Sequence, residues 1–196
     1  DSRGWSFLTA DLDVKRRLLP TILQEQVLAG ATLTRPRVIV IKSHAGAGRT
    51  VFFKRLAWEA AVTHDRLCLF AEADTELDPN VFAEIFRLTK AKVHLFIDDV
   101  ADRATAIDEL LRKARQAKWP LIVFLSERNN QWNTECDETL GRNVDDEYEI
   151  GKLNPGEIGE LLTRLDAHKC LGELARLTPD KRAEAFSKAY DGILLV

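Results

Sequence analysis

The stretch from 37 to 61 constrains the fold of this chain more than any other. It opens with a short apolar run at 37–41, passes through a glycine-bearing segment at 43–50, and takes up a helical pattern from Val51 onward. A β-branched apolar run of this length is typical of a central parallel strand. The order of strand, small-residue loop and helix therefore predicts one unit of an α/β sheet.

The loop in this stretch is a degenerate match to the phosphate-binding pattern G-x-x-x-x-G-K-[ST]. In SHAGAGRT, Gly48 and Thr50 match, whereas Ser43 stands at the first glycine and Arg49 at the lysine. Small residues let backbone N–H groups approach an anion, and the following helix points its positive end at the same place. We therefore expect a phosphate cradle, with an ordinary tight turn as the alternative. Its expected lining is Ser43, His44, Ala45, Gly46, Ala47, Gly48, Arg49, Thr50 and Val51.

Composition narrows the class of protein. The chain has 196 residues, enough for one domain or a domain with a small appendix, and its hydrophobic content of 45% allows a packed core. A net charge of −3 gives no reason to expect a nucleic-acid surface. The basic run at 15–17 is expected to be a solvated helix face.

The residue counts and apolar runs also predict where the protein is located and whether the chain is part of a longer one. The three cysteines show no zinc spacing, which fits a reducing cytosol. No apolar run approaches a membrane span and no signal peptide is present, so we expect a cytoplasmic protein with no membrane partner. Because the chain contains no methionine, we expect it to be a segment of a longer protein, whose other domains are its partners.

Apolar runs and capping signals alternate along the chain. Strands are expected at 67–70, 93–99, 121–125 and 148–153, and helices at 18–28, after Asp78-Pro79, at 103–117, and after Asn154 and Thr178. The segment 129–147 is polar and is expected to be irregular. This alternation predicts an α/β fold, a parallel sheet between two helical layers. A core domain at 1–153 and an all-helical subdomain at 154–196 are expected.

Polar side chains follow the predicted strands at the edge where open α/β sheets bind ligands. Asp98 and Asp99 end the run LFIDD, Glu72 and Asp74 follow an earlier run, and Arg128 follows the run LIVFLSER. Thr50 and Asp98 are expected to hold Mg²⁺, and Asp99 to orient or deprotonate an attacking water. Arg128 is expected to reach the γ-phosphate. The alternatives are that the aspartates merely end a strand and that Arg128 is a surface arginine paired with Glu127 or another acid.

A family resemblance accompanies these motifs. The segments KSHAGAGRTVFFKRLAWEAA, HLFIDD, FLSER and EIGKLNPGEIGELLTRL resemble the P-loop NTPase core of the STAND signalling proteins, which are related to NACHT, NB-ARC and AAA+ modules. In detail the chain is similar to the novel STAND modules of bacterial anti-phage defence proteins. The resemblance implies ATP or ADP and Mg²⁺ as ligands and is compatible with a homo-oligomer. It places the loop on Walker A, Asp98 and Asp99 on Walker B, Arg128 on the first sensor, residues 11–17 beside the adenine, and residues 154–190 on a helical lid.

Two departures from the pattern leave the enzymatic activity open. Ser43 must avoid a backbone conformation that only glycine takes easily, and arginine is larger and flatter than the lysine it replaces. We therefore expect nucleotide binding to survive better than hydrolysis. The first hypothesis is an ATP-dependent switch that controls an attached effector; the alternative is a degenerate pseudo-NTPase that acts as a scaffold or oligomerisation module. A phosphotransferase is disfavoured because no acceptor-binding insertion is visible.

Overall fold

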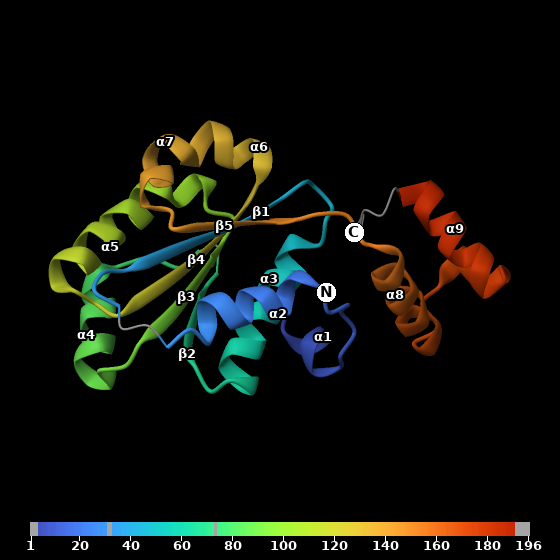
Figure 1. The fold of residues 1–196 in the computed structure, drawn as a ribbon, viewed down its shortest axis with the longest axis horizontal. Helices are drawn as coiled ribbons and strands as arrows, with labels where there is room; N and C mark the ends of the chain where they lie inside the picture. The colour runs from blue at the N-terminus through green and yellow to red at the C-terminus, as the bar shows by residue number, and fades with distance from the viewer. Residues whose placement is uncertain (1–3, 31–32, 73, 191–196) are drawn as a thin grey trace.

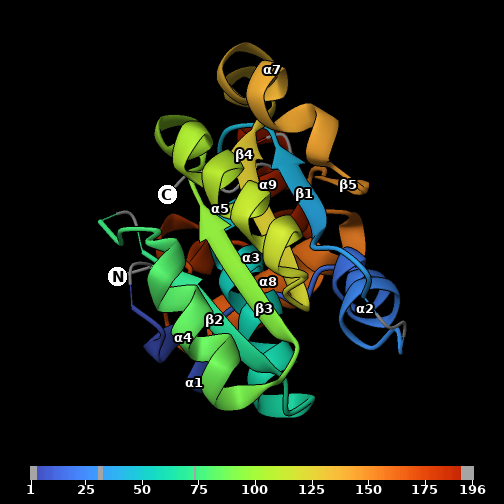
Figure 2. The same ribbon diagram turned by 90° about the vertical axis from the view of Figure 1, so that its left-hand side faces the viewer.

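Five parallel strands form the centre of the molecule. The computed structural model describes residues 4–30, 33–72 and 74–190, and within them the strand order is β2-β3-β4-β1-β5 (Figure 2). The strands are β1 (Arg37–Ser43), β2 (Leu67–Ala71), β3 (Val93–Asp98), β4 (Leu121–Arg128) and β5 (Asp146–Ile150). Every neighbouring pair is parallel, and β4, which carries Arg128, lies between β1 and β3.

Helices cover both faces of the sheet, which confirms the expected three-layer α/β fold. On one face lie α4 (Pro79–Thr89) and α5 (Ala104–Ala117), preceded by η3 (Ala101–Arg103). On the other lie α2 (Leu18–Ile22) and α3 (Arg49–Trp58), which continue as the wider π-turns η1 (Leu23–Val27) and η2 (Glu59–Thr63), with α1 (Ser6–Thr9) before them. Successive side chains along each strand point alternately to the two helical layers, and both faces are buried, as is usual for parallel sheets. Val38, Val40, Val123 and Leu125 pack on the α5 side, and Ile39, Ile41 and Phe124 on the α3 side.

The segment after β4 is helical, so the prediction of an irregular stretch at 129–147 is wrong. It forms α6 (Asn129–Gln131), η4 (Trp132–Cys136), α7 (Asp137–Leu140) and η5 (Gly141–Asn143) before β5 begins at Asp146. Trp132, Cys136 and Leu140 are almost fully buried in the core on the α5 side. They are spaced four residues apart, so they share one helix face. The polar majority around them hides this short apolar stripe in the sequence.

The chain after β5 forms a helical lobe, drawn in orange and red at one end of the molecule (Figure 1). It contains α8 (Pro155–Ala167), η6 (Gly172–Arg176) and α9 (Pro179–Tyr190). The expected capping box is present, because the Asn154 side chain accepts from the Glu157 N–H while the Glu157 side chain accepts from the Asn154 N–H. The lobe has an apolar cluster of its own, made of Leu153, Ile158, Leu162, Leu171 and Phe186. The domain boundary at 153/154 stays a prediction, and the end of the proposed subdomain, 191–196, lies outside the described residues.

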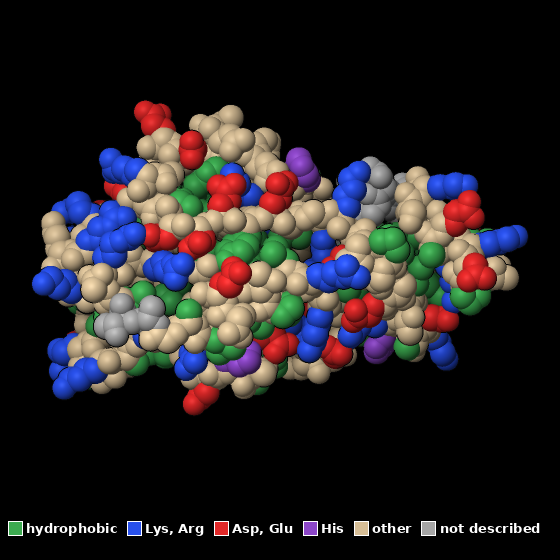
Figure 3. Space-filling view, viewed as in Figure 1, with side chains coloured by type: hydrophobic (Ala, Val, Ile, Leu, Met, Phe, Trp, Pro, Cys, Tyr) green, Lys and Arg blue, Asp and Glu red, His purple; other side chains and the backbone are tan. Residues whose placement is uncertain are grey.

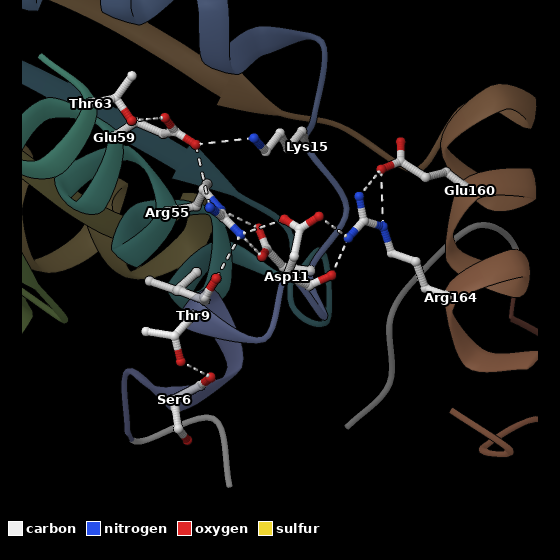
Figure 4. Close-up of polar contacts among 11 residues, drawn as sticks. Ser6, Thr9, Asp11, Lys15, Arg55, Glu59, Thr63, Glu160 and Arg164 are labelled. Carbon is white, nitrogen blue, oxygen red and sulfur yellow. Dashed lines mark hydrogen bonds and ion pairs between the residues drawn. The ribbon is translucent and has the colours of Figure 1, made fainter. Parts of the chain in front are cut away.

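The segment before α2 joins the core to this lobe. Figure 4 shows Arg55 of α3 and Arg164 of α8 pointing toward Asp11 from opposite sides. The Arg55 guanidinium binds Asp13 and lies 3.2 Å from the Asp11 carboxylate, while Arg164 lies 2.8 Å from the same carboxylate. Arg55 also pairs with Glu59, four residues further on at the start of η2. One chain of charges therefore runs from the core through the N-terminal segment to α8.

No helix in the described parts of the chain is both long and apolar enough to cross a membrane.

Candidate functional site

The loop between β1 and α3 has the backbone geometry of an anion cradle. Gly46 and Gly48 take φ values of 76° and 78°, in the left-handed region that side chains other than glycine rarely adopt. Ser43 is the last residue of β1 and is therefore extended, so the loop does not need glycine there. Helix α3 begins at Arg49, and the N–H groups of its first turn have no partner within the helix. These groups and the helix dipole face the carboxyl edge of the sheet, where an anion is favoured.

The remaining loop residues divide into buried and exposed ones. The Ser43 hydroxyl is buried and, among the described residues, has no hydrogen-bond partner. Ala47 is also buried. His44 and Ala45 are exposed, and the His44 ring lies 3.5 Å from the carboxylate of Glu149 on β5. His44 therefore belongs to the rim of the loop.

The two aspartates at the end of β3 have different environments. Asp98 is buried at 9% exposure, whereas Asp99 is exposed with a φ of 52°. Burial raises the pKa of Asp98, and this effect exceeds the opposing influence of the Arg49 guanidinium and of the Thr50 hydroxyl, which hydrogen-bonds to the Asp98 carboxylate. Asp99 is the first residue beyond the strand, and aspartate is among the few residues that tolerate this backbone conformation.

The contact between Thr50 and Asp98 decides whether Mg²⁺ fits. A hydroxyl and a carboxylate in contact are oxygen ligands of the kind that Mg²⁺ prefers. In the part of the chain that the structure describes, no three His, Cys, Asp or Glu side chains gather as a metal site. Mg²⁺ usually keeps several waters and phosphate oxygens as ligands, so a pair of protein oxygens suits it. Thr50 and Asp98 therefore fit the metal as a partial ligand set.

Arg49, which stands where the pattern has lysine, lies among carboxylates. Its side chain is 8% exposed. Its Nη1 donates to Glu127 Oε1 at 2.9 Å, its Nη2 donates to Asp99, and its Nε lies 3.5 Å from Asp98 Oδ1. Burial lowers the pKa of Arg49, but the three carboxylates outweigh it and the pKa is raised overall. The guanidinium thus carries its charge and neutralises part of an acidic site.

Glu127 is a site residue that the sequence reasoning missed. Its carboxylate is 1% exposed and accepts hydrogen bonds from the backbone N–H groups of Ala101 at 2.9 Å and Arg128 at 2.7 Å, besides the bond from Arg49. A signal was available, because Glu127 continues the alternation of Leu121, Val123 and Leu125 on the α5 side of β4, and both sides of this strand are buried. Arg128 is exposed, as the alternative of a surface arginine expected, and its hydrogen bond to Glu127 comes from its backbone N–H; its role at the γ-phosphate stays a prediction.

Arg16 corrects the expectation that the basic run at 15–17 is a solvated face. It is 8% exposed, and its Nη1 donates to the carbonyl oxygen of Ala47 in the loop at 3.0 Å. Its Nη2 donates to the carbonyl oxygens of Gly151 at 2.6 Å and Lys152 at 3.2 Å, between β5 and α8. Its Nε lies 3.3 Å from the carboxylate of Glu157 in the first turn of α8. Burial lowers the pKa of Arg16 despite this partner.

The Arg16 bond also orients the loop. A peptide unit is planar and trans, so its C=O and the following N–H point in opposite directions. By holding the Ala47 carbonyl, Arg16 directs the Gly48 N–H away from itself. One side chain thus connects the loop, the link after β5 and the first turn of α8.

Other polar residues lie away from this site. Glu72 and Asp74 are exposed after β2, an edge strand separated from β1 by β3 and β4. A cavity of about 460 Å³ lies at the amino edge of the sheet. Its lining includes Arg35, Asp108, Arg112, Arg115, Arg142 and Asp145. Basic side chains gather over α4 and α5 at that end of the molecule (Figure 3). The loop, Asp98, Asp99 and Glu127 instead meet at the carboxyl edge.

Comparisons with known proteins agree with this architecture. The fold is similar to that of C. elegans PCH-2, with a TM-score of 0.56 and 15% identity over 81% of this chain and 50% of that one. It is also similar to a chain of the E. coli MS115-1 HORMA:CdnC:Trip13 complex, with a TM-score of 0.57 and 17% identity over 86% of this chain and 67% of that one. The chain thus spans half the length of the PCH-2 chain. No curated protein matches it in sequence. The model of the family Novel STAND NTPase 5 matches residues 1–140, and the chain therefore belongs to that family of NTPases.

Proposed function

We propose that this chain is the ATP-binding switch module of a larger STAND signalling protein. The observation that carries the proposal is the loop at 43–50, where two left-handed glycines and the first turn of α3 meet Asp98 at the carboxyl edge of a parallel sheet. Family membership supports nucleotide binding as the general activity. ATP or ADP with Mg²⁺ is the specific ligand proposed.

Backbone and side-chain groups of the site have separate proposed roles. Phosphate oxygens are bound by the backbone N–H groups at the start of α3, as in other anion sites at helix N-termini; these are the N–H groups of Gly48, Arg49, Thr50 and Val51. Thr50 and Asp98 hold Mg²⁺, which when bound offsets phosphate charge. Asp99 is proposed to orient or deprotonate the attacking water, since its exposed carboxylate is open to solvent. Arg128, exposed at the end of the strand that pairs with β1, is proposed to contact the γ-phosphate.

The helical lobe is proposed to transmit the state of the loop. Arg16 binds the loop and the first turn of α8, while Arg164 of α8 binds Asp11. A change in the loop upon nucleotide binding therefore has one direct route to α8, through Arg16, and one indirect route from α3 through Arg55, Asp11 and Arg164. In this proposal the lobe controls the conformation or oligomerisation of an effector in the same longer, cytoplasmic chain. A role in bacterial defence is proposed from the resemblance of the module.

The first experiment identifies the bound nucleotide. The full-length protein is purified, denatured by heat, and the released nucleotide is identified by chromatography. Stoichiometric ATP or ADP is expected. Asp98→Ala should then weaken Mg²⁺-dependent ATP binding by at least about tenfold, because it removes a charged ligand. Asp180→Ala, on the exposed first turn of α9, is the matched control. A protein that carries no nucleotide and shows no thermal shift with Mg²⁺–ATP would contradict the proposal.

A scaffold without turnover is the second candidate, and one observation favours it. Arg49 is held by Glu127 and Asp99 and is bulkier than the usual lysine, so the group that normally serves the phosphates is engaged elsewhere. If this reading is correct, the protein hydrolyses no ATP, and Arg49→Lys creates activity. Hydrolysis by the natural sequence would exclude it.

A further inference from the structure

Arg49 is the charged side chain of the loop, yet the structure gives it only carboxylate partners. Each nitrogen of its guanidinium already faces one acid: Nη1 faces Glu127, Nη2 faces Asp99, and Nε faces Asp98. A guanidinium carries five N–H donors in a rigid plane, and here each of its three nitrogens is directed at a carboxylate. A phosphate therefore has to share the guanidinium with these acids or displace one of them.

Glu127 fixes where the guanidinium lies. Its two oxygens accept from the backbone N–H groups of Ala101 and Arg128 as well as from Arg49, and its carboxylate is 1% exposed. These backbone bonds tie the Glu127 carboxylate to the start of η3 and to the end of its own strand, so it is held in place and does not follow Arg49 toward the phosphate cradle. Breaking a buried pair of this kind is costly unless the freed charge finds a new partner.

Asp99 adds a second, more accessible hold. Its side chain is 67% exposed, and its backbone φ of 52° aims it from beyond the end of β3 toward Arg49. With Asp98 nearby, three carboxylates surround one guanidinium, so acidic groups outnumber basic ones at this point. An anionic ligand meets repulsion there as long as the guanidinium remains with the acids.

We propose that Glu127 and Asp99 are positioning residues that hold Arg49 away from the phosphate cradle, so that a nucleoside di- or triphosphate has to compete with them for the guanidinium. This inference rests on the proposed function and adds the regulation of the same site. Substituting these two acids should therefore have the opposite effect on nucleotide affinity to substituting a residue that contacts the ligand. Neutralising either acid frees Arg49 and tightens binding of the phosphates.

The test uses ADP and EDTA, so that neither hydrolysis nor a metal contributes. Binding of a fluorescent ADP analogue to the full-length protein is followed by anisotropy for wild type, Asp99→Asn and Glu127→Gln. Asparagine adopts the left-handed backbone of position 99 as readily as aspartate, which makes the first variant structurally mild. We expect binding tighter by about threefold for Asp99→Asn and about tenfold for Glu127→Gln, since the second pair is buried.

A matched control separates this effect from a change in net charge. Glu84→Gln removes a carboxylate that pairs with Arg87 on the exposed side of α4, far from the loop in the fold. It should leave ADP affinity within about 1.5-fold of wild type, because screened charges at that distance contribute little.

A double-mutant cycle separates competition for Arg49 from plain repulsion by an acid. Asp99→Asn is repeated in an Arg49→Met background. If the acids act by holding the guanidinium, the gain disappears there; if they only repel phosphate, it persists or grows, and the inference is overturned. Should Arg49→Met fail to fold, the Arg49 Nε signal in the ¹⁵N spectrum of the wild type decides. It should move on ADP addition, and a signal that stays in place while ADP binds refutes the competition.

The outcomes distinguish this inference from the proposed function. Wild-type binding that neither acid substitution improves overturns the inference and leaves the nucleotide site standing. Absence of ADP binding in wild type and in both variants, with and without Mg²⁺, overturns both. Binding seen only in the variants supports both, and shows that the acids close the natural site.

Discussion

Replacing Arg16 with methionine should destabilise the protein and loosen its helical lobe. The substitution keeps an unbranched apolar stem and removes the guanidinium, which donates to the carbonyl oxygens of Ala47, Gly151 and Lys152 and pairs with Glu157. Hydrogen bonds from charged donors contribute about 1.5–3 kcal/mol each, and removing one member of a buried ion pair costs about 3–5 kcal/mol. These contributions are not additive, because the carbonyl oxygens of Gly151 and Lys152 can bind water instead once the segment between β5 and α8 moves away. We expect a loss of about 3 kcal/mol.

The measurement is urea denaturation followed by tryptophan fluorescence. If the free energy of unfolding falls by about 2 kcal/mol per molar urea, a loss of about 3 kcal/mol lowers the urea concentration at the midpoint by about 1.5 M. Arg17→Met is the matched control, because Arg17 is exposed and its contact with Glu157 comes from its backbone N–H at 2.9 Å. Limited proteolysis should also cut the Arg16→Met variant faster at 151–154, where two of the lost hydrogen bonds lie. A midpoint within about 0.3 M of the Arg17→Met protein would refute the reasoning.

The remaining predictions concern stability. Burial lowers the pKa of His94 to about 4, so as the pH falls the unfolded chain takes up this proton before the folded protein does. The free energy of unfolding should therefore fall by about 3 kcal/mol between about pH 6.5 and pH 4. In urea titrations His94→Leu should remove this pH dependence, whereas His168→Leu, at an exposed position, should keep it. Trp132→Ala should cost about 3–5 kcal/mol by calorimetry, and a loss below about 1 kcal/mol would contradict its buried position. Asn154→Ala should cost about 1 kcal/mol by removing the cap of α8, against no change for Thr163→Ala in its exposed middle.

Local signals predicted most of the framework. The apolar runs predicted the five strands, although the last spans Asp146–Ile150 and not 148–153, and the caps Asp78 and Asn154 start α4 and α8 as expected. Each of these signals is complete within a few residues, so no tertiary information is needed. The loop and the aspartates at the end of β3 were found for the same reason, and the parallel topology brings them to one edge.

The buried charges could not be found in this way. Arg16 and Glu127 look like ordinary surface residues, since charged side chains are buried only when partners offset the cost of leaving water. The partners of Arg16 lie more than 130 residues away at Gly151 and Lys152, and Glu127 meets Arg49 across 78 residues. Residues that bind a ligand follow short motifs, whereas Arg16 and Glu127 contact other parts of the protein.

The reach of Arg16 along the chain bears on the order in which the protein folds. Its hydrogen bonds close loops of 31, 135 and 136 residues. Closing loops of this length costs chain entropy, so we expect these contacts to form late, after the folding transition state. During synthesis, Arg16 leaves the ribosome long before residues 151–157 are made, so its contacts with them can form only after that part of the chain has been synthesised. Kinetically, Arg16→Met should therefore speed unfolding and leave the refolding rate almost unchanged, so that this side chain governs how long the folded lobe stays in place.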